Sequence, residues 1–232
     1  MTLLSLFQYG FAVRALEAGV IVALVAPLIG IFLVLRRYSL IADTFAHVSL
    51  AGITIGFLLG WNPMLTALGA TLASSLGIER LRSAKKVYGE SALAIFLSGS
   101  LALAVVLASA GKGLNTNILY YLFGSIVTVT PTDVAVIAVL AAVVAGAIAL
   151  FYKELVFISF DEESAAVSGI KTHLINIILI MLAALTVSLA IPIVGALLIS
   201  ALMIIPVACA LQMKQGLTRT IFYAEAVSVC SV

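Results

Sequence analysis

The sequence predicts an all-α membrane protein, a single bundle of about seven or eight transmembrane helices over residues 1–232. Hydrophobic residues make up 64% of the chain and charged residues only 9%, whereas soluble domains average about 45–50% and about 25%. The mean hydropathy is +1.29. These values exclude an ordinary soluble enzyme, a disordered chain and a nucleic-acid-binding module. The formal net charge of +2 is too small to indicate an acidic partner, so the expected surroundings are a lipid bilayer.

Apolar stretches of about 20 residues can cross the hydrocarbon core of a bilayer. Such stretches lie at roughly 15–35, 40–60, 64–80, 91–110, 132–151, 173–191 and 193–212. Residues 219–232 begin an eighth that is too short to cross. We therefore expect either that the chain is cut there or that this end packs against another segment. A threonine, a proline and an acidic residue at Thr130, Pro131 and Asp133 predict a capped helix start.

The basic residues predict the orientation of these spans. If the spans alternate in direction, most lysines and arginines fall on one side: Arg36, Arg37, Arg80, Arg82, Lys85, Lys86, Lys153, Lys171, Lys214 and Arg219. Only Arg14 and Lys112 fall on the other side. The positive-inside rule makes the first side cytoplasmic. We therefore expect a multi-pass protein of the cell membrane, with its N-terminus outside and residues 61–63 and 111–131 facing outward.

Two ionisable residues lie within the second span, where such groups are costly and usually functional. Asp43 and His47 are four residues apart and therefore share one helical face. A carboxylate and a neutral imidazole suit Zn²⁺ or Mn²⁺. One pair supplies too few ligands for a tetrahedral site, but a two-fold dimer would bring two pairs together. The alternative at this stage is a structural His–Asp hydrogen bond, or a carboxylate that caps local backbone.

The second span is predicted to have two different faces. At about 100° per residue, Thr54 falls near Asp43 and His47 and becomes a candidate for lining the same path. The opposite arc carries only small residues, which suit close packing against another helix. These small residues are Ala42, Ala46, Ser49, Gly52, Gly56 and Gly60.

A short capped helix is predicted on the cytoplasmic side, between the fifth and sixth spans. The acidic residues Asp161, Glu162 and Glu163 begin it, Ser164 and Ala165 follow, and Gly169 ends it. Such a helix could transmit force from a partner, but the residues alone favour an ordinary solvated connector. His173, which opens the sixth span, fits an interfacial histidine.

Four separated stretches give the sequence a specific resemblance. LRRYSLIADTFAHVSLAG (35–52), NILYYLFGSIVTVTPTD (117–133), ISFDEESAAVSGI (158–170) and VGALLISALMIIPVACA (194–210) occur in this order. Together they resemble the membrane permeases of ABC importers for zinc, manganese and iron chelates, over nearly the whole chain. The resemblance implies a homodimer that pairs with two cytoplasmic ATP-binding cassette subunits and an extracellular metal-binding protein. It implies a transport permease and not an enzyme.

The resemblance also implies roles for particular residues. Asp43 and His47 match the aspartate and histidine that the family uses for metal passage, and the segment from Phe160 to Gly169 matches its ATPase-coupling helix. The segment around ADTFAH is more similar to zinc-type members, so Zn²⁺ is expected first and Mn²⁺ next, as transported substrate and not as a bound cofactor. Family members usually complete an eighth span after the position of Val232.

The motifs that are absent limit the alternatives. No G-x-x-x-x-G-K-[ST] phosphate loop occurs in the sequence, so ATP hydrolysis is expected in a separate subunit. No HExxH or GxSxG motif occurs either, which argues against an intramembrane hydrolase. Two alternatives stay open: a permease for a metal chelate or another small ligand, and an ion-driven transporter or channel that works without an ATPase.

Overall fold

The computed structural model describes residues 10–83, 89–110, 120–125 and 129–232. Within these ranges every regular element is helical. The longer helices are α1 (Gly10–Leu35), α2 (Ile41–Leu59), α3 (Pro63–Ser83), α4 (Gly89–Ala110), α6 (Pro131–Leu150), α9 (Thr172–Val194), α10 (Ala196–Gln212) and α11 (Leu217–Cys230). The short helices α7 (Tyr152–Phe160) and α8 (Glu162–Val167) lie between α6 and α9.

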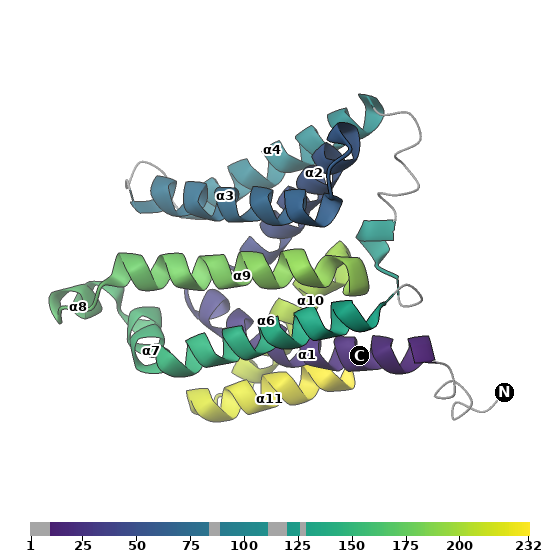
Figure 1. The fold of residues 1–232 in the computed structure, drawn as a ribbon. Helices are drawn as coiled ribbons and strands as arrows, with labels where there is room; N and C mark the ends of the chain where they lie inside the picture. The colour runs from purple at the N-terminus through teal and green to yellow at the C-terminus, as the bar shows by residue number, and fades with distance from the viewer. Residues whose placement is uncertain (1–9, 84–88, 111–119, 126–128) are drawn as a thin grey trace.

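Helix α9 runs through the middle of the bundle (Figure 1). On one side it packs against α2 and α3, with α4 beyond them, and on the other side it packs against α1 and α6. Helix α10 packs against α1, α11 and α2. Helices α7 and α8 lie together at one end of the bundle. The large side chains that are fully buried, among them Phe32, Phe45, Leu179 and Ile199, therefore come from the central helices.

Each stretch that the sequence marks as a span is helical in the structure, but not all of these helices have the length and composition of a span. Within the described residues, five helices qualify: α1, α2, α4, α6 and α9. Helix α10 has 17 residues, which gives about 25 Å against a hydrocarbon core of about 30 Å. The last turns of α3 contain three charged residues, Glu79, Arg80 and Arg82. The structure thus shows a multi-pass helical protein with five candidate spans, fewer than expected.

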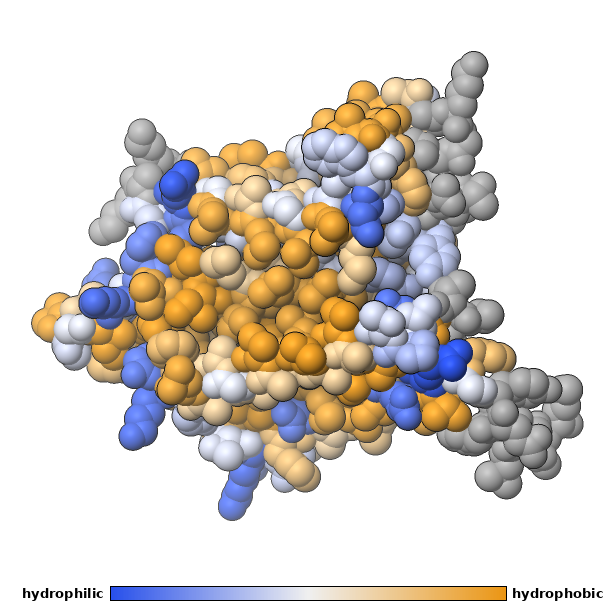
Figure 2. All heavy atoms as spheres, in the orientation of Figure 1, coloured by the Kyte–Doolittle hydropathy of each residue, from blue (hydrophilic) through white to orange (hydrophobic). Residues whose placement is uncertain are grey.

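The outer helices expose apolar surface on a scale that a soluble protein would not tolerate. Only 17% of the most apolar stretch of α4 and 22% of that of α6 are buried within the chain. Val106 and Val139, one on each helix, are 65% and 64% exposed. Figure 2 shows an apolar band across the middle of one face, with hydrophilic side chains gathered towards its ends. This is the surface expected of helices that face lipid.

The small-residue face of α2 packs against α3, as the sequence predicts. A Cβ atom on Gly52 would lie 2.7 Å from the Ala67 Cα atom and 2.8 Å from the Thr66 carbonyl oxygen. A Cβ atom on Gly56 would collide with Pro63 and Thr66. Only glycine at these two positions lets the backbones approach so closely. The opposite face of α2 is therefore held in a fixed orientation.

The start of α6 confirms the predicted helix cap. The Thr130 hydroxyl accepts a hydrogen bond from the Asp133 backbone N–H at 3.2 Å, and the Asp133 carboxylate accepts one from the Thr130 backbone N–H at 2.9 Å. This reciprocal pair is a capping box, and Pro131 occupies the first helical position. Most of the preceding loop, at 111–119 and 126–128, lies outside the described residues, as do Lys85, Lys86 and Lys112 of the orientation argument.

Helices α9 and α10 are separated by a close crossing of two backbones. Gly195 joins them at a φ of 88°, and Gly124 lies against it at a φ of 71°. A Cβ atom on Gly124 would lie 2.6 Å from the Gly195 nitrogen. Both positions need glycine because of the left-handed backbone and the close approach. The apolar run from 173 to 212 is thereby divided into two helices at this point.

Candidate functional site

Asp43 and His47 lie at the beginning of α2, one turn apart. Asp43 is in the first turn, and both side chains are half-buried. The helix starts here because the Ile41 N–H donates to the Tyr38 carbonyl at 3.0 Å. A carboxylate near a helix N-terminus is stabilised by the helix dipole. The pair therefore lies near one end of the span and not at its centre.

The side chains of this pair are not tied to other groups. Neither makes a hydrogen bond or an ion pair with a residue that the structure describes. In the part of the chain that the structure describes, Asp43 and His47 therefore form neither a hydrogen bond with each other nor a cap on the local backbone. A carboxylate and an imidazole are left available to an ion, in an otherwise apolar helix.

One chain alone does not complete a metal site. Among the described residues there is no group of three or more His, Cys, Asp or Glu side chains that could hold a metal ion. Thr54 is fully buried, and its hydroxyl donates to the Leu50 carbonyl at 2.8 Å. A metal site built on Asp43 and His47 would have two ligands from the described part of one chain and would need further ligands from elsewhere.

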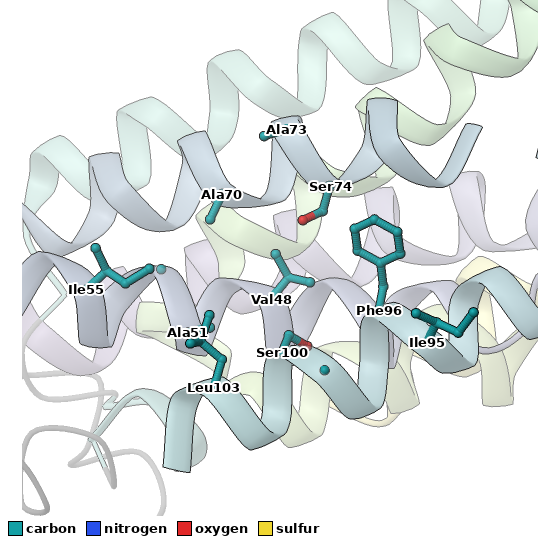
Figure 3. Close-up of a pocket in the computed structure, with 12 residues that line it drawn as sticks. Val48, Ala51, Ile55, Ala70, Ala73, Ser74, Ile95, Phe96, Ser100 and Leu103 are labelled. Carbon is teal, nitrogen blue, oxygen red and sulfur yellow. The ribbon is translucent and has the colours of Figure 1, made fainter. Parts of the chain in front are cut away.

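A separate apolar cavity lies between α2, α3 and α4 (Figure 3). Its volume is about 450 Å³. It is lined by apolar and small side chains, such as Val48, Ala51, Ala70, Phe96 and Leu103. Neither Asp43 nor His47 is among the residues that line it. Because its lining contains no carboxylate, imidazole or thiol and offers only the hydroxyls of Ser74 and Ser100, this cavity is not a candidate transition-metal site.

The predicted short cytoplasmic helix is present as α8, with slightly different bounds. Asp161 is its N-cap, and the carboxylate of Asp161 accepts a hydrogen bond from the Ser164 N–H at 2.9 Å. Hydrogen bonds from Ser164 lower the pKa of Asp161 below its ordinary value. The helix spans Glu162–Val167, and Gly169 follows at a φ of 88°. Ala165 is buried, whereas Val167 is 90% exposed.

Phe160 does not belong to this helix, which corrects the expected boundary. It is the last residue of α7, a helix that the sequence does not predict. Asp161 is extended, with φ −151° and ψ 96°, and separates the two helices because its side chain caps the second one. Phe160 is 70% exposed and can still form part of a docking surface next to α8.

A cluster of charged and polar residues, which we call the Glu162 cluster, joins α8 to α3, to α9 and to the turn directly after α1. The Glu162 carboxylate accepts hydrogen bonds from Asn176 Nδ2 at 2.7 Å and from Arg36 Nη2 at 3.1 Å. Arg82 Nη1 lies 3.3 Å from Glu162. The cluster contains Arg36, Tyr38, Glu79, Arg82, Glu162, His173 and Asn176.

A buried carboxylate forms the inner side of the Glu162 cluster. The Glu79 side chain is 1% exposed and is bound by Arg82 through two hydrogen bonds of 2.9 Å. Ser83 Oγ donates to Glu79 at 3.0 Å, and His173 Nδ1 lies 3.3 Å from the same carboxylate. His173 is therefore part of a specific cluster and is not merely an interfacial residue.

The charge on Glu162 is stabilised by its surroundings. Burial alone would raise its pKa, but the hydrogen bond from Asn176 and the positive charges of Arg82 and Arg36 outweigh burial and lower the pKa below the ordinary value of 4.5. A carboxylate with a lowered pKa stabilises the folded state above the ordinary pKa, and this contribution is lost as the pH falls through the lowered value.

The pH dependence of stability tests the Glu162 cluster. We expect Glu162→Gln to lower the free energy of unfolding by about 1–3 kcal/mol at pH 7, because hydrogen bonds to a charged group contribute about this much and solvent screens a half-exposed carboxylate. The difference from the wild type should persist down to a pH of about 4.5 and disappear below it. Thermal unfolding in detergent across pH measures this. A difference that grows as the pH falls would contradict this picture.

The comparisons with known proteins agree with the resemblance in the sequence. The model of the ABC 3 transport family matches residues 8–232. A probable metal transport system membrane protein of Treponema pallidum is 38% identical over 219 residues, which cover 94% of this chain and 82% of the relative. The manganese transport system membrane protein MntC of Listeria innocua is 32% identical over 221 residues, covering 95% and 79%.

Two further matches extend this result. The high-affinity zinc uptake system membrane protein ZnuB of Haemophilus influenzae is 29% identical, over 94% of this chain and 84% of the relative. The solved structure of PsaBC from Streptococcus pneumoniae in complex with Fab superimposes with a TM-score of 0.82 and 29% identity, over 97% of this chain and 81% of that chain. The chain thus belongs to the ABC 3 transport family, as a multi-pass membrane permease of a metal transporter and not as an enzyme.

Proposed function

We propose that this permease imports a divalent transition-metal ion and that the ion passes between Asp43 and His47. The observation that carries the proposal is the pair itself. A carboxylate and an imidazole lie half-buried, one turn apart, with no partner among the described residues. Ionisable groups within a membrane helix are costly and usually have a function. The membership of the chain in a metal-transporting family supports the assignment.

We further propose a homodimer in which two copies of the pair meet near a two-fold axis. A tetrahedral site needs four ligands, and the described residues of one chain bring together no group of three or more His, Cys, Asp or Glu side chains. Two chains would supply two carboxylates and two imidazoles. Thr54 would line the path two turns further along α2, where its hydroxyl donates to the Leu50 carbonyl.

The remaining parts of the importer follow from the same proposal. The end of the bundle that carries α8 faces the cytoplasm, by the positive-inside rule, and the N-terminus lies outside. Two ATP-binding cassette subunits dock on α8 and on the exposed side chains beside it. A metal-binding protein delivers the ion from outside, and the pathway opens alternately to each side of the cell membrane.

The donor set accommodates both candidate metals and favours Zn²⁺ through the imidazole. Imidazole favours Zn²⁺, while a carboxylate with an imidazole also accommodates Mn²⁺. A relative at 32% identity is named for manganese and another at 29% is named for zinc. We propose transport of both ions, with Zn²⁺ preferred because of the imidazole and because of the zinc-type likeness around Asp43.

Uptake into liposomes tests the proposal directly. The chain is reconstituted with its ATPase and metal-binding partners, and the uptake of radiolabelled Zn²⁺ and Mn²⁺ is measured with and without ATP. We expect ATP-dependent uptake of both ions, with competition between them. Uptake without ATP and without the ATPase would support an ion-driven transporter or channel. Uptake of a chelate that free metal does not compete with would support the chelate alternative.

A further inference from the structure

One side chain of the short helix α8, Glu162, makes hydrogen bonds to three other parts of the bundle. Glu162 accepts hydrogen bonds from Asn176 Nδ2 at 2.7 Å and from Arg36 Nη2 at 3.1 Å, and its Oε2 atom lies 3.3 Å from Arg82 Nη1. Asn176 belongs to α9, Arg82 to the last turn of α3, and Arg36 to the turn directly after α1. A movement of α8 therefore reaches two helices and the turn before α2 through a single carboxylate.

The rest of α8 is loosely attached. Among the described residues, the other hydrogen bonds of α8 stay within the segment 161–172. Glu163 and Ala166 are exposed, and Val167 is 90% exposed. A cavity of about 720 Å³ lies between α8, the end of α3 and the start of α9, with Arg82, Glu162 and His173 among its lining residues. Apart from the buried Ala165, the contacts that hold α8 on the bundle are therefore the polar ones of Glu162, and the cavity leaves open space beside the helix.

The arginines that bind Glu162 also hold the residue that precedes α2. The Tyr38 ring lies 5.5 Å from Arg36 Cζ and 5.7 Å from Arg82 Cζ, in cation–π geometry. Tyr38 is buried, and its carbonyl accepts the hydrogen bond from Ile41 that begins α2. A displacement of the two guanidinium groups therefore acts on the start of the helix that carries Asp43.

The Glu162 cluster also contains polar atoms without partners. Arg36 Nη1 and Asn176 Oδ1 are buried and make no hydrogen bond in this arrangement. Each unpaired buried polar atom costs free energy, so the hydrogen bonding of the cluster is incomplete in this arrangement. An arrangement of α8 that paired these atoms would recover this free energy. Coupling between distant sites needs an element with two such arrangements.

We propose that Glu162 is a positioning residue that transmits the movement of α8 to the start of α2, through Arg36, Arg82 and the Tyr38 ring. This inference rests on the proposed function, because it names how ATP-driven movement at α8 reaches the metal pathway. It differs from a purely structural role in one respect. A structural tie would affect stability alone, whereas a relay sets how many metal ions are moved for each ATP hydrolysed.

The coupling ratio of Glu162→Gln tests the relay. The variant is reconstituted with the ATPase and the metal-binding partner, and Mn²⁺ uptake and ATP hydrolysis are measured in the same liposomes. We expect the complex to assemble and to hydrolyse ATP, while the Mn²⁺ taken up per ATP falls by about tenfold, within the about 5–150-fold range of typical allosteric coupling. Glu90→Gln is the matched control, since Glu90 is an exposed carboxylate in the first turn of α4. It should match the wild type.

A second variant tests the aromatic step without changing any charge. Tyr38→Leu keeps Glu162, Arg36 and Arg82 but removes the ring between the two arginines and α2. We expect the same fall in Mn²⁺ per ATP, even if Glu162→Gln fails to assemble. A wild-type ratio in either assembled variant, or a fall as large in Glu90→Gln, would overturn the relay. A wild type that transports neither Mn²⁺ nor Zn²⁺ would instead overturn the proposed function on which the relay rests.

Discussion

Metal uptake is expected to be lost when Asp43 is replaced by Asn or His47 by Ala. Each change removes a ligand in both copies of the chain. The loss should exceed the about 10–100-fold that removal of an outer-shell partner of a metal site typically costs. Both side chains are half-buried and make no hydrogen bond with a described residue. The variants should therefore fold, assemble with the ATPase and hydrolyse ATP.

The measurement is ATP-dependent uptake of radiolabelled Zn²⁺ and Mn²⁺ into liposomes. Glu17→Gln is the control, because Glu17 is an exposed carboxylate in α1, another candidate span. It should transport like the wild type. Since a ligating imidazole must be neutral, wild-type uptake should also weaken in acid. Full uptake by both Asp43→Asn and His47→Ala would show that the ion takes another route.

Gly52→Ala is expected to destabilise the protein by about 1–3 kcal/mol, although alanine is the better helix former. The added methyl group would lie 2.7 Å from the Ala67 Cα atom and 2.8 Å from the Thr66 carbonyl oxygen, both in α3. Backbone atoms cannot move aside as a flexible side chain would. Helix α2 has to shift away from α3, which also displaces Asp43 and His47 on its other side.

Gly69→Ala in α3 is the matched control. A Cβ atom there would meet nothing within 4 Å, so the substitution should be neutral or stabilise by up to about 1 kcal/mol. Thermal unfolding of the two variants in the same detergent compares them, and Mn²⁺ uptake reports on the displaced pair. Equal stability of Gly52→Ala and Gly69→Ala would mean that the contact between α2 and α3 is looser than the structure indicates.

Properties that depend on local sequence were predicted well. Length and hydropathy locate the long helices, and the small-residue stripe identifies Gly52 and Gly56 as packing positions. The cap at Thr130 and Asp133 follows from neighbouring residues alone. Helix α7 was missed and Phe160 was assigned to the wrong helix, because the segment Tyr152–Phe160 has no strong start or stop signal and continues directly from α6.

The packing of the apolar helices could not be predicted from the sequence. Helices α6 and α9 are both strongly apolar, yet 22% of the apolar stretch of one is buried and 61% of the other. Lipid is as apolar as a protein interior, so hydrophobicity does not distinguish a lipid-facing side from a packed one. Which helix lies at the centre depends on contacts between segments that are distant in the chain.

The Glu162 cluster could not be predicted from the sequence either, because it joins segments that are distant in the chain. Arg36 and Glu162 are 126 residues apart, and Arg82 and Glu162 are 80 apart. Only the pair Glu79–Arg82 has a local spacing that the sequence shows. Asn176, a lone amide in an apolar span, was the one further signal. Burial of Glu79 at 1% exposure is evident only once α3 and α9 are placed side by side.

The most direct test of the metal pathway is a structure of the assembled transporter, loaded with Mn²⁺ or Zn²⁺ and measured by anomalous scattering. We expect one ion near a two-fold axis, bound by the carboxylates of Asp43 and the imidazoles of His47 from both chains. An ion held by other residues, or a dimer in which both pairs face lipid, would contradict the pathway proposed for this permease.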